Sequence, residues 1–378
     1  MKTDIVFIIT GLNVGGAEMM LLKLLSRLDR NLFAPKVISL VAHPVMMKKF
    51  YDIDIPVTNL AVGKGLSLAK GLGQLLKILY SCKPHIVQTW MYHADLLGGI
   101  CAKLAGNQPI IWNIRHSDLD EKVDKKSTIL TAKTCARLSY YLPDRIVCCS
   151  ETAKSIHAEL GYDHSKIVVI PNGFDLNHFR PNSDARQKLR KEFGISDSQI
   201  LIGLIGRFHP QKDHHNFIQA AAKLALRIKD AEFLLCGKDM VWQNKQLTEM
   251  IEGTGLRKSF HLVGVRDDIP ALTASLDIAT SASSCGEGFS NTIGEAMACG
   301  VPCVVTDVGD SALIVGSTGL VVPPGMPEAL AKALLDLVNM GEVGRRALGC
   351  EARTRIENNF SLAKIVDLYQ KLYLQTVH

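Results

Sequence analysis

The sequence predicts an α/β protein made of two parallel-sheet domains. Its 378 residues exceed the usual range of a single hydrophobic core. Short β-rich runs alternate with helical patterns along both halves, which is typical of parallel strands joined by crossover helices. The alternation restarts after Pro171-Asn172-Gly173, whose Asn-Gly pair marks a turn. We therefore expect two Rossmann-like domains.

In the first half, apolar runs predict strands and the amphipathic patterns between them predict helices. The strands are expected at 5–9, 36–41, 86–90, 110–114, 146–149 and 166–170. The clearest helices are expected at 17–28, 66–80 and 94–105. A polar stretch through Pro181 and Asp184 is typical of a linker, so the domain boundary is expected near residues 172–182.

The second half repeats the pattern and ends in a helix. Its strands are expected at 200–205, 232–236, 260–263, 278–281, 302–306 and 319–322. The apolar residues of the last helix, 362–374, are consistent with one buried stripe made of Ile365, Val366, Leu368, Tyr369, Leu372 and Tyr373.

Composition excludes several classes of protein. A hydrophobic content of 47% with 21% charged residues is typical of ordered globular chains and not of disordered or fibrous ones. The ten cysteines lack the paired spacing of a zinc site or a redox motif, so we expect reduced core residues. The apolar run at 5–9 is too short for a signal segment or a membrane span, which indicates a cytoplasmic chain.

The positive charge is confined to the first half. Residues 1–170 carry a formal charge of +7 and the remainder carries −1. This basic excess has two readings: a solvated face, or a surface that contacts an anionic membrane.

Residues 286–300 hold two glutamates eight positions apart around a loop rich in Gly, Ser and Asn. A helix that begins near Ser290 would direct unpaired N–H groups at an anion. Glu287 at the loop edge and Glu295, about two turns up the helix, could each accept hydrogen bonds from pairs of hydroxyls. Such a site suits a nucleotide sugar, with its pyrophosphate held between two sugars.

Other glycines and cations follow predicted strands. Arg207 and Lys212 come after the strand at 200–205, at the edge where open α/β sheets bind ligands, and two cations there suit a diphosphate. Gly15 and Gly16 stand before the first helix and allow a ligand close to the backbone, or make a simple tight turn. Their spacing from Gly11 is not that of a dinucleotide fingerprint, which disfavours a dehydrogenase.

Five segments together resemble the signatures of retaining glycosyltransferases with the GT-B fold, in particular the large family four. They span nearly the whole chain in the expected order and read Gly11-Leu12-Asn13-Val14-Gly15-Gly16-Ala17-Glu18, Pro171-Asn172-Gly173-Phe174-Asp175, Gly206-Arg207-Phe208 with Lys212, Gly264-Val265-Arg266-Asp267-Asp268, and the Glu-x7-Glu stretch from Glu287 to Glu295. The resemblance implies two domains facing a cleft: an acceptor domain over 1–175, a donor domain over 176–360, and a C-terminal helix, 361–378, that crosses back to the first.

The resemblance also implies roles for individual residues. Arg207 and Lys212 would stabilise the departing diphosphate, Glu287 would contact hydroxyls of the transferred sugar, and His116 would bind that sugar near its reacting carbon. These four form the expected catalytic group. The expected donor-binding set is Gly15, Gly16, Arg207, Lys212, Val265, Arg266, Glu287, Gly288, Phe289, Ser290, Asn291, Thr292 and Glu295. The expected acceptor-binding set is Glu18, His93 and Arg115.

Some of these residues have simpler readings. A lone histidine is usually structural or exposed, which applies to His93 and His116, and Glu295 could be a solvated helix glutamate. Asp268 is expected to cap the turn that follows it. No Asp-x-Asp lies in a suitable donor-binding loop, so neither a metal nor a cofactor is expected.

We therefore expect a metal-independent retaining glycosyltransferase. It would move a hexose or N-acetylhexosamine from a nucleotide diphosphate, UDP before GDP, to a hydroxyl of a lipid-linked saccharide. Bacterial family members of this type extend lipopolysaccharide O-antigen, capsule or related polysaccharides, so we expect a peripheral position on the cytoplasmic face of the inner membrane and no nucleic-acid partner. Two alternatives are a nucleotide-sugar epimerase or phosphorylase on the same fold, and a non-catalytic nucleotide-sugar-binding protein.

Overall fold

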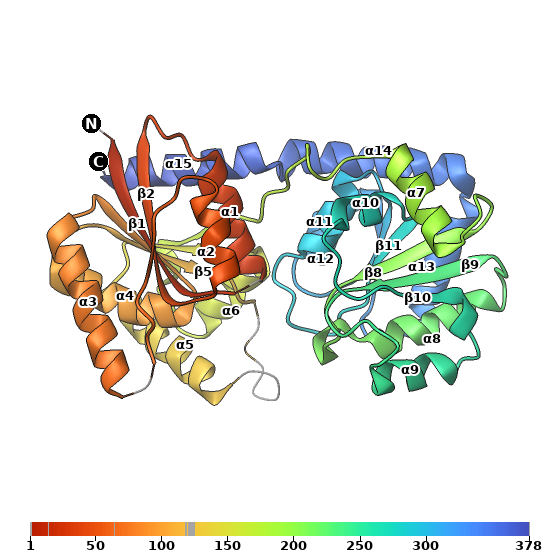
Figure 1. Ribbon diagram of the computed structural model, residues 1–378, viewed down its shortest axis with the longest axis horizontal. Coiled ribbons are helices and arrows are strands. Elements are labelled where there is room, and N and C mark those ends of the chain that lie inside the picture. The colour runs from red at the N-terminus through yellow and green to blue at the C-terminus, as the bar shows by residue number, and fades with distance from the viewer. Residues whose placement is uncertain (1, 14, 64, 118, 120–124, 378) are drawn as a thin grey trace. The chain divides into compact units, whose positions relative to one another are not determined.

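The computed structural model describes residues 2–13, 15–63, 65–117, 119 and 125–377. The chain divides into two compact units (Figure 1). The first comprises Met1–Gly173 together with Leu362–His378, and the second comprises Phe174–Ser361. Each unit is a parallel sheet covered by helices, which confirms the predicted α/β class and the pair of Rossmann-like domains.

The first unit contains a seven-stranded parallel sheet in the order β3-β2-β1-β4-β5-β6-β7. The strand order reverses between β1 and β4, and open α/β sheets bind ligands at the carboxyl ends of the strands that flank such a switch point. The strands are β1 (Thr3–Leu12), β2 (Phe33–Ala42), β3 (Val57–Asn59), β4 (Ile86–Trp90), β5 (Ile110–Ile114), β6 (Arg145–Cys148) and β7 (Ile167–Val169).

Helices cover both faces of this sheet because its strands carry apolar side chains on both sides. One face packs against α1 (Gly16–Arg27), α2 (Pro44–Tyr51) and α15 (Leu362–Val377). The other packs against α3 (Leu66–Cys82), α4 (Tyr92–Ala105), α5 (Lys126–Leu138) and α6 (Glu151–Glu159). A short 3-10 turn, η1 (His164–Lys166), precedes β7.

The last helix, α15, belongs to the first unit, as the crossing-back prediction requires. Its Tyr369 hydroxyl accepts a 2.9 Å hydrogen bond from the Asn113 amide, and its Tyr373 hydroxyl donates one of 2.5 Å to Gln88. The predicted buried stripe is wrong at Leu368, which is 42% exposed, because the stripe runs instead through Leu362 one turn before Ile365.

The second unit holds a six-stranded parallel sheet in the order β10-β9-β8-β11-β12-β13, with its own switch point between β8 and β11. The strands are β8 (Ile200–Ile205), β9 (Ala231–Cys236), β10 (Phe260–Leu262), β11 (Ile278–Ser281), β12 (Cys303–Thr306) and β13 (Gly319–Val322). The helices are α7 (Ser183–Phe193), α8 (His214–Ala225), α9 (Lys245–Glu252), α10 (Ile269–Ala274), α11 (Asn291–Ala298), α12 (Ser311–Val315), α13 (Pro327–Asn339) and α14 (Gly341–Asn359), with 3-10 turns η2 (Pro210–Lys212), η3 (Arg257–Ser259) and η4 (Gly316–Thr318).

Two features were missed by the sequence patterns. The edge strand β3 has three residues, too few to show a period, and it is paired to β2. The expected linker also contributes to a core: Phe174 is fully buried, and its N–H donates to the Phe360 carbonyl at 2.9 Å.

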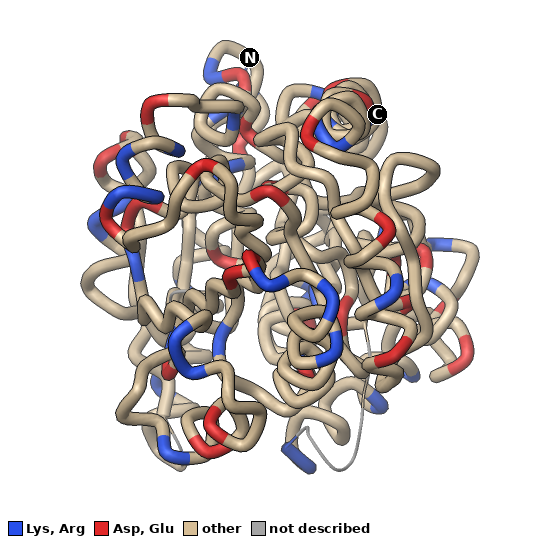
Figure 2. The backbone as a smooth tube through the Cα atoms, turned by 90° about the vertical axis from the view of Figure 1, so that its right-hand side faces the viewer, with Lys and Arg blue, Asp and Glu red and all other residues tan. Residues whose placement is uncertain are grey.

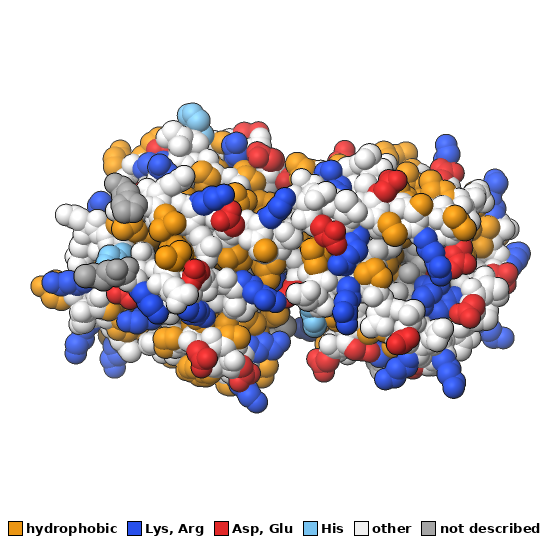
Figure 3. Space-filling view, turned by 90° about the horizontal axis from the view of Figure 1, so that it is seen from above, with side chains coloured by type: hydrophobic (Ala, Val, Ile, Leu, Met, Phe, Trp, Pro, Cys, Tyr) orange, Lys and Arg blue, Asp and Glu red, His pale blue; other side chains and the backbone are white. Residues whose placement is uncertain are grey.

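The cysteines and the charges are distributed as follows. Seven of the ten cysteines are buried, whereas Cys350 is exposed. In the described part of the chain, no helix is both long and apolar enough to cross a membrane. Lys and Arg are interspersed with Asp and Glu along the backbone seen in Figure 2, and both signs also lie interspersed on the face shown in Figure 3.

Candidate functional site

Glu287 lies in the loop that joins β11 to α11, at the switch point of the second unit. Its carboxylate forms an ion pair with the Lys212 ammonium, which follows the neighbouring strand β8. The Ser283 hydroxyl donates a 2.8 Å hydrogen bond to the same carboxylate oxygen. The side chain of Glu287 is only 13% exposed and that of Lys212 is 23% exposed. The structure therefore brings together two of the four predicted catalytic residues.

The charge state of Glu287 follows from these contacts. Burial favours the neutral acid, but the charge and hydrogen bond of Lys212, the hydroxyl of Ser283 and the charge of Arg207 together lower the pKa below its ordinary value. Glu287 is therefore an anion at neutral pH and can accept hydrogen bonds from sugar hydroxyls.

The loops after β8, β9 and β10 are closely connected around Arg207. The Phe208 N–H donates to the Lys238 carbonyl at 2.9 Å, and the Gly237 N–H donates to the Gly264 carbonyl at 2.8 Å. A Cβ atom at Gly237 would lie 2.1 Å from the Gly206 carbonyl oxygen, so only glycine permits this approach. The Arg207 side chain is exposed at this edge of the sheet. A fixed backbone thus presents a cation beside the Glu287 and Lys212 pair.

Helix α11 begins where the sequence predicted, with Ser290 at its N-cap position. Phe289 and Ser290 are buried, whereas Asn291, Thr292 and Glu295 are partly exposed. Glu295 lies little more than one turn into the helix, not two, because α11 begins at Asn291, only four residues earlier. Of the residues between Glu287 and Glu295, those up to Ser290 therefore belong to the loop and those from Asn291 onward to the helix.

The segment after β10 differs in part from expectation. Val265 is 74% exposed. The Arg266 guanidinium donates to Asp268 and to Glu192, each at 2.7 Å, which raises the pKa of Arg266. Asp268 occupies the N-cap position of α10 but makes no capping hydrogen bond with its side chain, so that prediction is wrong. Both oxygens of the Asp268 carboxylate instead accept hydrogen bonds from the Arg266 guanidinium.

In the first unit, a cavity of about 200 Å³ lies at the carboxyl ends of β1 and β4. It gathers the predicted residues His93, Arg115 and His116. Its other lining residues are Thr10, Ala17, Met91, Tyr92 and Thr128. Burial lowers the pKa of His93, which keeps this imidazole neutral. Its wall combines the apolar side chains of Ala17 and Met91 with the polar groups of the other six residues, which could orient a small molecule.

Gly15, Gly16 and Glu18 lie at the start of α1, next to Ala17 of the cavity wall. The Glu18 carboxylate folds back over the helix start, so a Cβ atom at Gly15 would lie 2.5 Å from its Oε2. Burial raises the pKa of Glu18, although the backbone N–H groups of Glu18 and Asn13 oppose the shift. Val14, within the same motif, lies outside the described residues.

Arg115 is held from two sides. Its guanidinium lies 5.1 Å from the centre of the Trp90 ring and donates to the Asn172 amide oxygen. Asn172 belongs to the predicted Pro-Asn-Gly turn, so two separate sequence motifs meet here. Within the described part of the chain, Nη1 of Arg115 is buried without a hydrogen-bond partner.

Tyr92, which lines the cavity, and His157, which contacts Tyr92, were not singled out by any sequence pattern. Nδ1 of His157 lies 2.6 Å from the Ala153 carbonyl, which can only accept, so Nδ1 carries the proton. Burial lowers the pKa of His157 to about 4, so Nε2 is unprotonated and accepts a 2.6 Å hydrogen bond from the Tyr92 hydroxyl. The Tyr92 ring packs edge-on against His116 at 6.2 Å. A histidine inside a helical pattern gives no sequence signal for this arrangement.

Asp95 is a second residue that the sequence did not single out. It lies on α4, the helix of Tyr92 and His93, and is 0% exposed. The Thr89 hydroxyl donates to Oδ1 at 2.5 Å, and Oδ2 has no hydrogen-bond partner among the residues that are described. Burial raises its pKa to about 7, against smaller opposing effects of Thr89 and the Asn113 N–H.

We expect Asp95→Asn to change how stability depends on pH. Because the folded pKa is raised, the folded state holds a proton that the unfolded chain loses between about pH 4 and pH 7. The contribution of Asp95 to the free energy of unfolding is thus present in full below about pH 4 and lost as the pH rises towards 7. The variant should lose less stability, or gain more, between pH 5 and pH 7 in urea unfolding. Parallel curves for wild type and variant would contradict this, and Asp52→Asn, at an exposed position, is the control.

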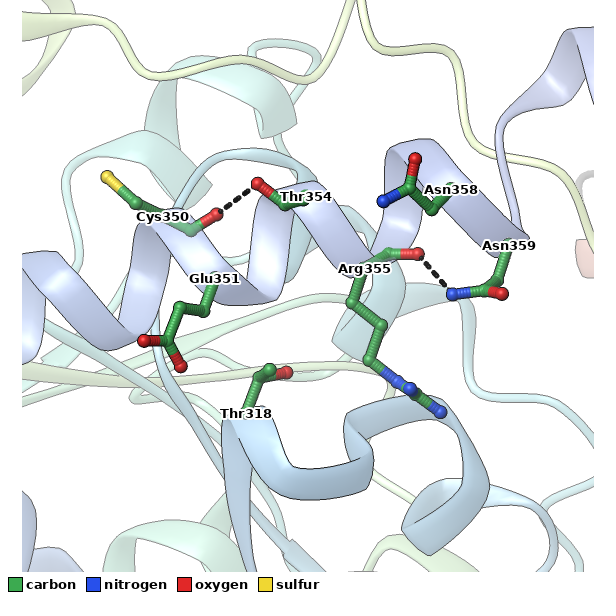
Figure 4. A pocket seen from close by; sticks show the side chains of 7 residues that line it. All are labelled: Thr318, Cys350, Glu351, Thr354, Arg355, Asn358 and Asn359. Carbon is green, nitrogen blue, oxygen red and sulfur yellow. Dashed lines mark hydrogen bonds between the residues drawn. The ribbon is translucent and has the colours of Figure 1, made fainter.

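A groove elsewhere in the second unit contains none of the predicted residues (Figure 4). It runs along α14 and is lined by Thr318, Cys350, Glu351, Thr354, Arg355, Asn358 and Asn359. Arg355 donates to the Ile314 carbonyl at 2.9 Å and to the Leu313 carbonyl at 2.6 Å, which ties α14 to the end of α12. Among the described residues, no group of three or more His, Cys, Asp or Glu side chains is placed to hold a metal ion.

Two family models match the chain, one on each unit. The model described as Glycosyltransferase Family 4 matches residues 14–178, and the model described as Glycosyl transferases group 1 matches residues 199–340. Each match includes predicted site residues near the switch point of its unit. The match over 14–178 contains Gly15 to Glu18 and His116, and the match over 199–340 contains Arg207 to Glu295.

Relatives and solved structures agree with these matches. The Escherichia coli UDP-Gal:alpha-D-GlcNAc-diphosphoundecaprenol alpha-1,3-galactosyltransferase is 28% identical over 313 residues, covering 82% of this chain and 80% of that protein. The Staphylococcus aureus capsular polysaccharide biosynthesis glycosyltransferase CapM is 25% identical over 342 residues, covering 88% and 84%. The crystal structure of Anabaena Alr3699/HepE in complex with UDP superposes with a TM-score of 0.86 at 21% identity, covering 99% of this chain and 100% of that one. A Rickettsia africae glycosyltransferase superposes with a TM-score of 0.87 at 22% identity, covering 100% and 99%.

Proposed function

The chain belongs to the GT-B glycosyltransferases, with a family 4 domain followed by a group 1 domain, and on that premise we propose a retaining transferase that acts in surface polysaccharide biosynthesis. The donor is a nucleotide-diphosphate hexose or N-acetylhexosamine, and the acceptor is a hydroxyl of a lipid-linked saccharide. Lipopolysaccharide O-antigen and capsule are the products that fit this chemistry best.

UDP is the first choice of donor nucleotide and GDP the second. The name of the E. coli relative specifies UDP-galactose and a diphosphoundecaprenol-linked acceptor, and the Anabaena neighbour was crystallised with UDP and with UDP-glucose. These facts belong to those proteins. They support the proposal because both resemble this chain over at least three quarters of its length.

The observation that carries the proposal is the pairing of Glu287 with Lys212 next to Arg207 at the switch point of the second unit. Departure of the nucleotide diphosphate builds negative charge, which fixed cations stabilise more in the transition state than in the ground state. Lys212 is already oriented by its ion pair, so little rearrangement is needed. Glu287 accepts hydrogen bonds from the transferred sugar, and Glu295 accepts them from the ribose.

The second unit binds the donor and the first unit binds the acceptor. We assign Glu18, His93 and Arg115 to the acceptor and His116 to the transferred sugar. The diphosphate leaves from the face that the acceptor hydroxyl enters, takes up the hydroxyl proton and so retains the anomeric configuration. Arg207, Lys212 and the start of α11 together stabilise the negative charge of the phosphates, so no metal is needed in this scheme.

We expect the thermal stability of the protein to rise with one nucleotide and its sugar conjugates, in EDTA. A ligand at about 100 times its Kd adds about 2.7 kcal/mol to the free energy of unfolding. UDP, GDP, ADP and their common sugar conjugates are compared on wild type and on Glu295→Ala, with Glu249→Ala on α9 as the matched control. A shift with UDP that Glu295→Ala abolishes and Glu249→Ala preserves supports the donor site. Equal shifts in all three proteins, or a shift that appears only with a divalent metal, would contradict it.

A further inference from the structure

Five aromatic rings of the first unit form a continuous chain that ends at the cavity of that unit. They follow the order Trp112, Tyr162, His157, Tyr92 and His116, and the centres of neighbouring rings lie 5.1–6.4 Å apart, within the range of attractive ring pairs. The first four are between 0% and 4% exposed. His116 is partly exposed and lines the cavity together with Tyr92. The chain therefore connects the buried core of the unit to the cavity.

Two hydrogen bonds fix the middle of this chain. Nδ1 of His157 donates to the Ala153 carbonyl of its own helix, and the Tyr92 hydroxyl donates to Nε2 of His157, each at 2.6 Å. A neutral imidazole has one donor and one acceptor nitrogen, so a single tautomer satisfies both contacts. The Ser150 hydroxyl caps the same helix, α6, by accepting from the Ala153 N–H at 2.9 Å. The Tyr92 hydroxyl is therefore directed into the interior, and its ring is what Tyr92 presents to His116.

The backbone next to Tyr92 is also held in place. Met91 precedes α4 with a φ of +73°, a conformation that a residue with a Cβ atom keeps only where the surrounding structure maintains it. The Met91 N–H donates to the Asn113 carbonyl at 3.0 Å, and the Ala94 N–H donates to the Thr10 hydroxyl at 3.0 Å. Tyr92 is thus fixed both at its backbone and at its hydroxyl, and strain of this kind is concentrated at functional sites.

We propose that Tyr92 and His157 are positioning residues for His116, a step that rests on the proposed function. The rings of Tyr92 and His116 meet edge-on at 85°, and this contact restricts the orientation of the His116 imidazole. In the proposed reaction His116 binds the transferred sugar near its reacting carbon, where a small displacement of the binding group lowers the rate. His157 is fully buried and acts through the Tyr92 hydroxyl, without contact to the substrate.

Tyr92→Phe tests the hydroxyl, and Tyr373→Phe is its matched control. Each variant removes one buried tyrosine hydroxyl of the first unit, which donates to His157 at 2.6 Å in one case and to Gln88 at 2.5 Å in the other. Release of UDP from saturating UDP-galactose or UDP-glucose measures kcat. We expect kcat to fall by about ten- to a hundredfold in Tyr92→Phe and to stay near the wild-type value in Tyr373→Phe. The thermal shift with UDP should be normal in both, because the second unit binds the nucleotide.

Two further comparisons separate positioning from packing. His157→Leu leaves the Tyr92 hydroxyl without its acceptor, whereas the side-chain oxygen of His157→Gln can accept the same hydrogen bond. We therefore expect kcat to fall in His157→Leu as it does in Tyr92→Phe, and to be partly rescued in His157→Gln. In a His116→Ala background, Tyr92→Phe should lower kcat no further, because the group that Tyr92 positions is gone. A purely structural role predicts the same fold-loss with and without His116.

Histidine ring signals in proton–nitrogen correlation spectra give a second measurement that needs no substrate. The His116 signals, identified by their loss in His116→Ala, should shift in Tyr92→Phe and in His157→Leu but not in Tyr373→Phe. Normal kcat in Tyr92→Phe, an equal loss in Tyr373→Phe, or unshifted His116 signals in Tyr92→Phe would overturn this inference. If wild type releases no UDP from either sugar nucleotide, the proposed donors are rejected, and the His116 signals still decide whether Tyr92 and His157 position that ring.

Discussion

Replacing Lys212 by Met should lower kcat by about a hundred- to a thousandfold, the usual effect of removing one group that stabilises negative charge developing in a transition state. Lys212 is held in place at the candidate site, because its ammonium is paired with the largely buried Glu287. Initial rates with saturating nucleotide sugar measure the effect. Lys238→Met is the control, since it removes an exposed cation from the same edge of the sheet without contacting Glu287.

The same substitution should destabilise the fold. Without Lys212, the Glu287 carboxylate stays buried with the Ser283 hydroxyl and the more distant Arg207 charge, so its pKa should rise. Removing one partner of a fully buried ion pair costs about 3–5 kcal/mol, and we expect less here because Lys212 is 23% exposed. Urea unfolding measures this cost.

Adding Glu287→Gln to Lys212→Met separates the two effects. The neutral amide needs no counter-charge, so the double variant should recover part of the lost stability. Its activity should stay low, because the cation that faces the leaving group is still absent. Recovery of both properties in the double variant, or full activity in Lys212→Met alone, would remove Lys212 from the proposed chemistry.

The sheets were predictable because buried parallel strands leave a strong signal. The runs at 86–90, 110–114, 200–205, 278–281 and 319–322 match strands β4, β5, β8, β11 and β13 residue for residue. Of these, β4, β5, β8 and β11 are buried on both faces and therefore read as continuous apolar runs, whereas β13 is an edge strand that reads as an apolar run although only Val322 is buried. The three-residue edge strand β3 is only partly buried, so its residues Val57 to Asn59 carry no comparable pattern.

The site was predictable in its residues and less so in its contacts. Lys212 and Glu287 each follow a strand, and these two strands are neighbours. Their carboxyl ends lie at the same edge of the sheet, so both residues could be expected at one switch point. Three hydrogen bonds could not be predicted: Ser283 to Glu287, Arg266 to Glu192, and Tyr92 to His157. They join residues from 4 to 74 positions apart. Contacts of this kind depend on tertiary packing and have no local period that a sequence pattern could reveal.

Gly309 determines where the Glu287 loop lies. It follows β12 with a φ of +58°, a left-handed conformation that glycine adopts without strain. A Cβ atom there would lie 1.8 Å from the Glu287 carbonyl oxygen and 3.0 Å from that of Gly288. The next residue, Asp310, donates its N–H to the Gly288 carbonyl at 3.0 Å. The backbone of Glu287 and Gly288 therefore packs directly against Gly309.

We expect Gly309→Ala to lower the free energy of unfolding by about 2–4 kcal/mol, the sum of left-handed strain and overpacking. Because the new methyl group must displace the Glu287 backbone, kcat should also fall by about a hundredfold. Gly325→Ala is the matched control: its φ is +66°, and nothing lies within 4 Å of the added Cβ atom. It should therefore show only the smaller cost of the left-handed conformation, with normal activity. If the two variants lose the same stability and both remain active, the loop tolerates displacement and the position of Glu287 does not limit transfer.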